Sequence, residues 1–83
     1  MIVKILYFAW VREKVGLSSE KVQTNARTVD ELIIELCEKG ENYKVAFANL
    51  NEIKVALDQN MADFNSSLLE VKEVAFFPPM TGG

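Results

Sequence analysis

Residues 28–37, TVDELIIELC, decide the fold, because they specify both the start and the buried face of a helix. Thr28 can accept a hydrogen bond from the backbone N–H of Glu31, and the Glu31 side chain can reach back, which is the pattern of a capping box. Apolar residues then recur at the spacing i, i+3, i+4, i+7 and i+8, so they share one face of the helix. They are Val29, Leu32, Ile33, Leu36 and Cys37. Gly40 is predicted to end this helix.

Apolar strands are predicted at both ends of the chain. Residues 2–8, IVKILYF, are β-branched and aromatic with a single charge, so we expect a central strand with both faces largely covered. Residues 73–77, EVAFF, form the last strand, and the prolines that follow end it because proline cannot donate a hydrogen bond to a sheet. These two strands are expected to lie side by side and parallel, with the helix across one face.

Shorter elements connect these three. We expect a helical segment at 9–16, a polar edge strand at 20–24, a short helix at 43–50, a strand at 53–57 and its short partner at 61–64. This order predicts an α+β fold of the β-grasp, ubiquitin-like architecture, a mixed sheet with one main helix packed across one face. The domain is expected to span residues 1–77, and residues 78–83 are expected to form an extended, flexible tail.

The composition argues against several classes of function. The net charge is −3 without any run of Lys or Arg, so we expect no binding to nucleic acid. There is no histidine, which removes Ser–His pairs and histidine metal sites, and no phosphate-binding glycine-rich loop is present. We therefore expect no metal and no cofactor bound by this chain. No apolar run approaches the roughly 18 residues of a membrane span, and a single cysteine suits the reducing cytoplasm.

Cys37 is the one thiol and has two interpretations. A nucleophilic or persulfide-carrying thiol needs exposure and an electropositive neighbourhood. Cys37 instead continues the apolar face of the helix, so the pattern favours a buried small hydrophobe.

The C-terminal tail, PPMTGG, is the candidate reactive segment. It could be a frayed end, but two prolines stiffen its departure from the last strand and two glycines let the backbone enter a narrow channel. Its reach is at most about 20 Å. A terminal carboxylate has a pKa of about 3.3–3.7, so it is an anion at pH 7 and needs activation, most simply as an acyl-adenylate. A separate enzyme that uses ATP would supply it. The residues are Pro78, Pro79, Met80, Thr81, Gly82 and the reactive Gly83.

Three segments together resemble the MoaD family, the small subunits of molybdopterin synthase: FAWVREKVG at 8–16, TVDEL at 28–32 and EVAFFPPMTGG at 73–83. The resemblance implies that a MoeB-type enzyme adenylates Gly83 with ATP and that a sulfur donor protein converts it to a thiocarboxylate. The loaded tail then enters a MoaE-type large subunit, which carries the catalytic side chains, and gives sulfur to cyclic pyranopterin monophosphate. The expected assembly is a heterotetramer, and this chain is a carrier rather than a catalyst.

Other functions remain open from the sequence. A terminal Gly-Gly also suits a thiamine-type sulfur carrier or a ubiquitin-like protein modifier, and an interaction domain with an inert tail is a third possibility.

One local departure from the family pattern concerns the turn before the last strand, where the family often has an Asp-Gly type turn and this chain has Glu70-Val71-Lys72.

A partner-binding surface is predicted from the alternation along EVAFF. Val74 and Phe76 are assigned to the core beneath the helix, so Phe77 is expected to point away from it as an exposed aromatic. Met61 is expected near Phe77. Related small subunits use an apolar patch at corresponding positions, so Phe77 and Met61 are the predicted partner-binding residues.

Overall fold

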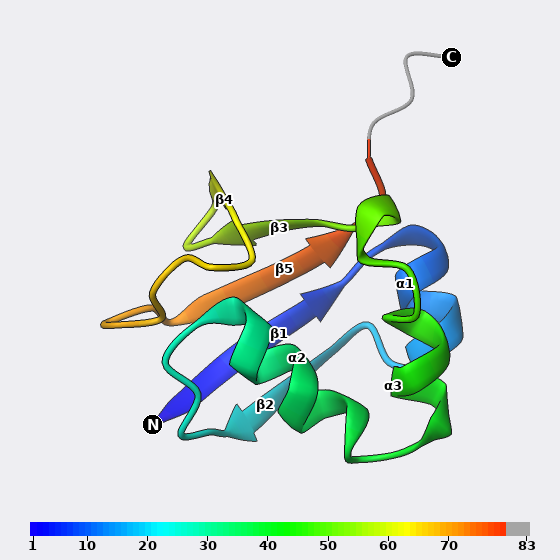
Figure 1. The fold of residues 1–83 in the computed structure, drawn as a ribbon, viewed down its shortest axis with the longest axis horizontal. Coiled ribbons are helices and arrows are strands. Elements are labelled where there is room, and N and C mark those ends of the chain that lie inside the picture. Colours follow the sequence, from blue (N-terminus) through cyan, green and yellow to red (C-terminus); the bar gives the residue numbers. More distant parts are fainter. Residues whose placement is uncertain (80–83) are drawn as a thin grey trace.

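The computed structural model describes residues 1–79, and its five strands form one mixed sheet in the order β2-β1-β5-β3-β4 (Figure 1). The strands are β1 (Ile2–Tyr7), β2 (Ser19–Gln23), β3 (Lys54–Leu57), β4 (Asn60–Ala62) and β5 (Glu73–Phe77). The helices are α1 (Ala9–Val15), α2 (Val29–Cys37) and α3 (Glu41–Ala46), with the 3-10 turn η1 (Leu50–Glu52). This is the predicted β-grasp fold. None of the helices within residues 1–79 is long and apolar enough to cross a membrane.

The two terminal strands are neighbours and run parallel, as the sequence predicts. In the register, Ile5 lies beside Val74 and Tyr7 beside Phe76, and β5 occupies the centre of the sheet. The prediction that both faces of β1 are covered is wrong. Val3, Ile5 and Tyr7 are buried, whereas the alternate residues of β1 are exposed or half-buried. The helices therefore cover only one side, and the other side is an open sheet face.

Helix α2 begins as predicted but ends differently. The Thr28 hydroxyl accepts from the Glu31 backbone N–H at 3.3 Å, while the Glu31 carboxylate accepts from the N–H of Arg27 at 3.1 Å instead of reaching Thr28. The helix stops at Cys37, before Gly40. Gly40 is not a left-handed C-cap, because its φ of 165° is extended and it serves as the N-cap of α3.

The core lies between the sheet and the helices. Phe76 is fully buried and meets two other rings, Tyr7 at a centroid distance of 6.3 Å and Phe47 at 5.0 Å. Apolar positions of α2 complete this core, as the helical periodicity predicts; they are Val29, Leu32, Ile33 and Leu36.

The turn before β5 is built without glycine. Glu70 adopts a left-handed conformation with φ 64°. The Asp58 carboxylate, from the β3–β4 hairpin, then accepts hydrogen bonds from the backbone N–H groups of Lys72 at 3.1 Å and Glu73 at 2.9 Å. A side chain from the neighbouring hairpin thus fixes the start of the central strand.

Candidate functional site: the end of the central strand

The C-terminal tail follows the central strand of the sheet, β5. β5 is hydrogen-bonded to β1 on one side and β3 on the other, and its last residue, Phe77, lies in register with Lys54. The backbone N–H of Phe8 also donates to the carbonyl of Phe76 at 3.1 Å. In Figure 1 the chain leaves β5 beside η1, at the opposite end of the sheet from the N-terminus. The position from which the tail departs is therefore fixed.

Pro78 and Pro79 follow directly and are both half-buried. They line a hollow of about 440 Å³ together with Trp10 of α1 and Glu52 of η1. The tail residues Met80, Thr81, Gly82 and Gly83, which carry the predicted reactive group, lie outside the described residues.

The alternation along β5 is confirmed. Val74 and Phe76 are fully buried, and Phe77 faces the opposite, open side of the sheet. Phe77 is half-buried, whereas an exposed aromatic was expected. It keeps part of its ring accessible immediately before the tail.

Met61 lies on the same open face as Phe77. It pairs with Ala56 of β3, and Phe77 pairs with Lys54, two residues away along the same strand. β3 separates the two side chains, so they are two strand spacings apart, roughly 10 Å across the sheet. Met61 is 67% exposed. The two predicted partner-binding residues thus share a face without being direct neighbours.

An apolar row crosses the open face beside Phe77 and ends at Met61. The register places four side chains in line from β1 to β4, namely Leu6, Ala75, Ala56 and Met61. Sequence reasoning identified only Met61 of this apolar row, because which alanines and leucines line up depends on the strand order and register.

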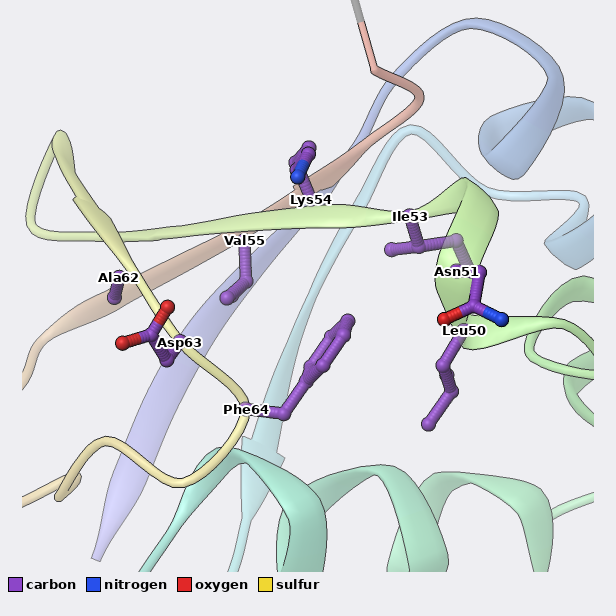
Figure 2. Close-up of a pocket in the computed structure, with 8 residues that line it drawn as sticks. All are labelled: Leu50, Asn51, Ile53, Lys54, Val55, Ala62, Asp63 and Phe64. Atoms are coloured by element: carbon purple, nitrogen blue, oxygen red, sulfur yellow. The ribbon is translucent and has the colours of Figure 1, made fainter.

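A second hollow, of about 230 Å³, lies on the side of β3 that faces away from the open sheet face (Figure 2). The Lys54 and Val55 side chains point to opposite sides of β3, and the Phe64 ring lies on the Val55 side. None of its lining residues belongs to the apolar row. Two of them are close to the surface described above: Lys54 is in register with Phe77, and Ala62 follows Met61 on β4. The hollow is smaller than the roughly 300 Å³ at which ligand pockets begin, so we do not assign a small-molecule site there.

Cys37 packs as a small hydrophobe. It is half-buried against the core, and its Sγ lies 3.9 Å from the Tyr43 carbonyl. Burial raises the pKa of the Cys37 thiol, and the nearby charge of Lys44 offsets only part of this. The thiol is therefore protonated at neutral pH, which is unfavourable for a nucleophile.

Sequence reasoning missed a partly buried carboxylate cluster around Glu20. One oxygen of Glu20 accepts from the hydroxyls of Tyr7 and Tyr43, each at 2.8 Å, and the other accepts from Lys39 at 2.7 Å. Burial alone raises the pKa of Glu20, but the three hydrogen bonds outweigh it and hold the pKa below its ordinary value. These groups come from β1, β2, α3 and the segment after α2, so no local spacing could have revealed the cluster. It ties the edge strand to the helices.

The fold and the position of the tail together define the class of this protein. It is a β-grasp domain whose C-terminal tail directly follows the central strand. A model of the ThiS family matches residues 5–83, and the chain belongs to this family. The molybdopterin synthase sulfur carrier subunit of Escherichia coli K12 is 35% identical over 81 residues, which cover 98% of this chain and 99% of the relative. This similarity confirms the resemblance to MoaD-type small subunits.

Solved structures show the same fold. SAMP1 from Haloferax volcanii superposes with a TM-score of 0.79 at 20% identity, covering all of both chains. A chain from the complex of subunits 1 and 2 of the molybdopterin-converting factor of Helicobacter pylori 26695 has a TM-score of 0.67 at 24% identity, again over the full length of both chains. These likenesses confirm the β-grasp architecture.

Proposed function

We propose that this chain is the sulfur-carrier subunit of a molybdopterin synthase. The observation that carries the proposal is the near full-length similarity to the E. coli sulfur carrier subunit in a chain that ends in Gly-Gly. The anchored exit from β5 supports it, because a tail that must enter another protein's active site benefits from a fixed point of departure.

The chemistry centres on the carboxylate of Gly83. In the proposed cycle this carboxylate attacks the α-phosphate of ATP and releases pyrophosphate, which gives an acyl-adenylate. Sulfide-level sulfur from a donor protein displaces AMP and leaves a thiocarboxylate. The thiocarboxylate sulfur then forms a carbon–sulfur bond to cyclic pyranopterin monophosphate, and water cleaves the acyl–sulfur bond and restores the Gly83 carboxylate. Two successive carriers supply the two dithiolene sulfurs.

The proposed partners are those that the similarity to MoaD-type subunits implies. Residues 1–79 contain no group of three or more His, Cys, Asp or Glu side chains placed to hold a metal, and the sequence has no phosphate-binding glycine-rich loop. Because the sequence has no such loop, we assign ATP to a MoeB-type activating enzyme. The similarity to MoaD-type subunits implies that the catalytic side chains lie on a MoaE-type large subunit, in a cytoplasmic heterotetramer. The H. pylori neighbour, which is a complex of two subunits, supports a large-subunit partner.

Two parts of the described structure have a role in this proposal. β5 and the prolines present the tail, while Phe77 and the apolar row give the partners a surface to bind. The same surface would have to serve the activating enzyme and the large subunit in turn, because both need access to Gly83.

The direct test is incubation of the purified chain with ATP and a MoeB-type enzyme, followed by detection of the acyl-adenylate. A chain that lacks Gly83 is the matched control and is expected to give none. A protein modifier would also be adenylated, but it would leave Gly-Gly remnants on lysines of other proteins. Failure of the full-length chain to form an adenylate would contradict the proposal.

A further inference from the structure

The open sheet face carries lysines although the chain as a whole is acidic. The net charge is −3, yet Lys4, Lys21 and Lys54 project from this face, all exposed, against one half-buried carboxylate, Glu73. The segment that forms α2 and the start of α3, on the covered side, concentrates acidic residues instead. They are Asp30, Glu31, Glu35, Glu38 and Glu41. The two sides of the molecule thus differ in the sign of their charge.

Lys4 and Lys21 form a like-charge pair. They are directly opposite each other in the antiparallel register of β1 and β2, so their side chains stand on the same face. Like charges in this position destabilise a sheet. Glu73 is next to Lys4 on the other side, but the two ion pairs found within residues 1–79 lie elsewhere, at Lys39–Glu20 and Lys44–Glu41. The fold therefore keeps two lysines opposite each other without a formed ion pair to either of them within residues 1–79.

The lysines flank the apolar row on both sides. Lys4 precedes Leu6 by two residues on β1, and Lys54 precedes Ala56 by two residues on β3, which runs in the opposite direction. β1 runs parallel to β5 and β3 runs antiparallel to it, so β1 and β3 point in opposite directions. Lys4 and Lys54 therefore lie on opposite sides of the apolar row. An apolar centre with a charged rim is the usual anatomy of a protein–protein interface.

We propose that the open face binds an acidic surface of the large subunit, whose carboxylates face the Lys4–Lys21 pair and Lys54. This inference rests on the proposed function and adds the electrostatic character of its partner. Binding would place anions between two lysines that repel each other in the free chain. The same charges would speed encounter, because complementary charge at the rim of an interface acts mainly on the association rate.

The test is the rate of association with the large subunit, measured by stopped flow at low and high ionic strength. Lys21→Glu removes the like-charge pair and is expected to slow association about threefold or more at low salt. The double variant with Lys54→Glu is expected to associate about tenfold more slowly than the parent, and its association rate should depend less on salt. Lys44→Glu is the matched control, since it makes the same change in net charge on α3 and is expected to leave the rate within about twofold. Thermal melts are expected to show that Lys21→Glu is at least as stable as the parent, because the new carboxylate lies opposite Lys4.

The outcomes distinguish a failure of this inference from a failure of the proposed function. Association of Lys21→Glu at the parental rate with the parental salt dependence would overturn the inference while leaving the sulfur-carrier function intact, and a faster rate would show that the partner surface is basic. A parent chain that does not bind the large subunit at all would contradict the proposed function itself, and the inference with it.

Discussion

The ring of Phe76 meets the ring of Phe47 edge-on, with the centroids 5.0 Å apart and the ring planes at 76°. Phe76 is fully buried at the centre of the sheet, so its ring connects β5 to the segment that follows α3. We expect Phe76→Ala to lower the free energy of unfolding by about 3–5 kcal/mol, as for other large-to-small changes in a core. Chemical denaturation of the purified variant measures this.

Phe77→Ala is the matched change on the opposite face of the same strand. Its ring is half-buried and faces the open side of the sheet, which is the proposed partner surface, so we expect a smaller loss of stability and a larger loss of binding to the large subunit, roughly 2 kcal/mol or more. Titration calorimetry and thermal melts of both variants compare the two effects. A Phe77→Ala protein that binds like the parent but melts as low as Phe76→Ala would show that Phe77 serves the core.

The Glu20 cluster predicts a dependence of stability on pH. The pKa of Glu20 is lowered in the folded protein relative to its ordinary value of 4.5, so the folded state binds this proton less readily than the unfolded chain. The stabilisation is complete above the unfolded pKa and is lost as the pH falls through the folded pKa. We therefore expect urea midpoints to fall below about pH 4.5.

Glu20→Gln isolates this contribution. The amide keeps one acceptor for the tyrosine hydroxyls but loses the charge that attracts Lys39, so we expect a loss of about 1 kcal/mol or more at pH 7. The variant should also show a smaller fall in stability between pH 6 and pH 3. An unchanged pH profile in Glu20→Gln would assign the acid sensitivity to other carboxylates.

The β3–β4 turn offers a stabilising substitution. Asp58 and Gln59 have φ values of 49° and 71°, a left-handed conformation that costs a residue with a Cβ roughly 1–2 kcal/mol. Gln59→Gly is expected to raise the melting temperature by several degrees, about 4–8 °C per kcal/mol gained. Asp58→Gly is the control: it relieves the same strain but removes the carboxylate that holds Lys72 and Glu73, so it should lower the melting temperature.

Cys37→Ala tests whether the thiol has a chemical role. The side chain is half-buried and its pKa is raised by burial, so we expect a cost of about 1 kcal/mol from the small cavity and normal loading of sulfur on the tail. Loss of loading in a Cys37→Ala protein with a normal circular dichroism spectrum would favour a persulfide carried by Cys37.

The sequence predicted those parts of the fold that depend on local pattern. The capping residue Thr28, the apolar face of α2 and the alternation along β5 follow from spacing alone, and all three are confirmed. The end of α2 was misplaced because Gly40 marks the start of α3, and a glycine by itself does not show which helix it borders. The open face of β1 was also missed, since an apolar strand looks the same whether one or both of its faces are covered.

Features made by long-range contacts could not be predicted. The Glu20 cluster joins residues 13, 19 and 23 positions away from Glu20, and the Lys4–Lys21 pair depends on the register of β1 against β2. The Asp58 carboxylate reaches the start of β5 across 14 and 15 residues. The candidate site divides in the same way. The local motif FFPPMTGG indicated the tail directly, whereas the surface beside the tail could be found only from the register of the sheet.

The central claim, that Gly83 carries sulfur, is tested most directly by the intact mass of the chain after reaction with ATP, a MoeB-type enzyme and a sulfur donor. We expect an increase equal to the difference between a sulfur and an oxygen atom, located on Gly83 by fragmentation. A chain lacking Gly83, or one extended by a single residue, should remain folded and show no such increase. An unchanged mass for the full-length chain, or normal sulfur transfer by the chain lacking Gly83, would contradict the account.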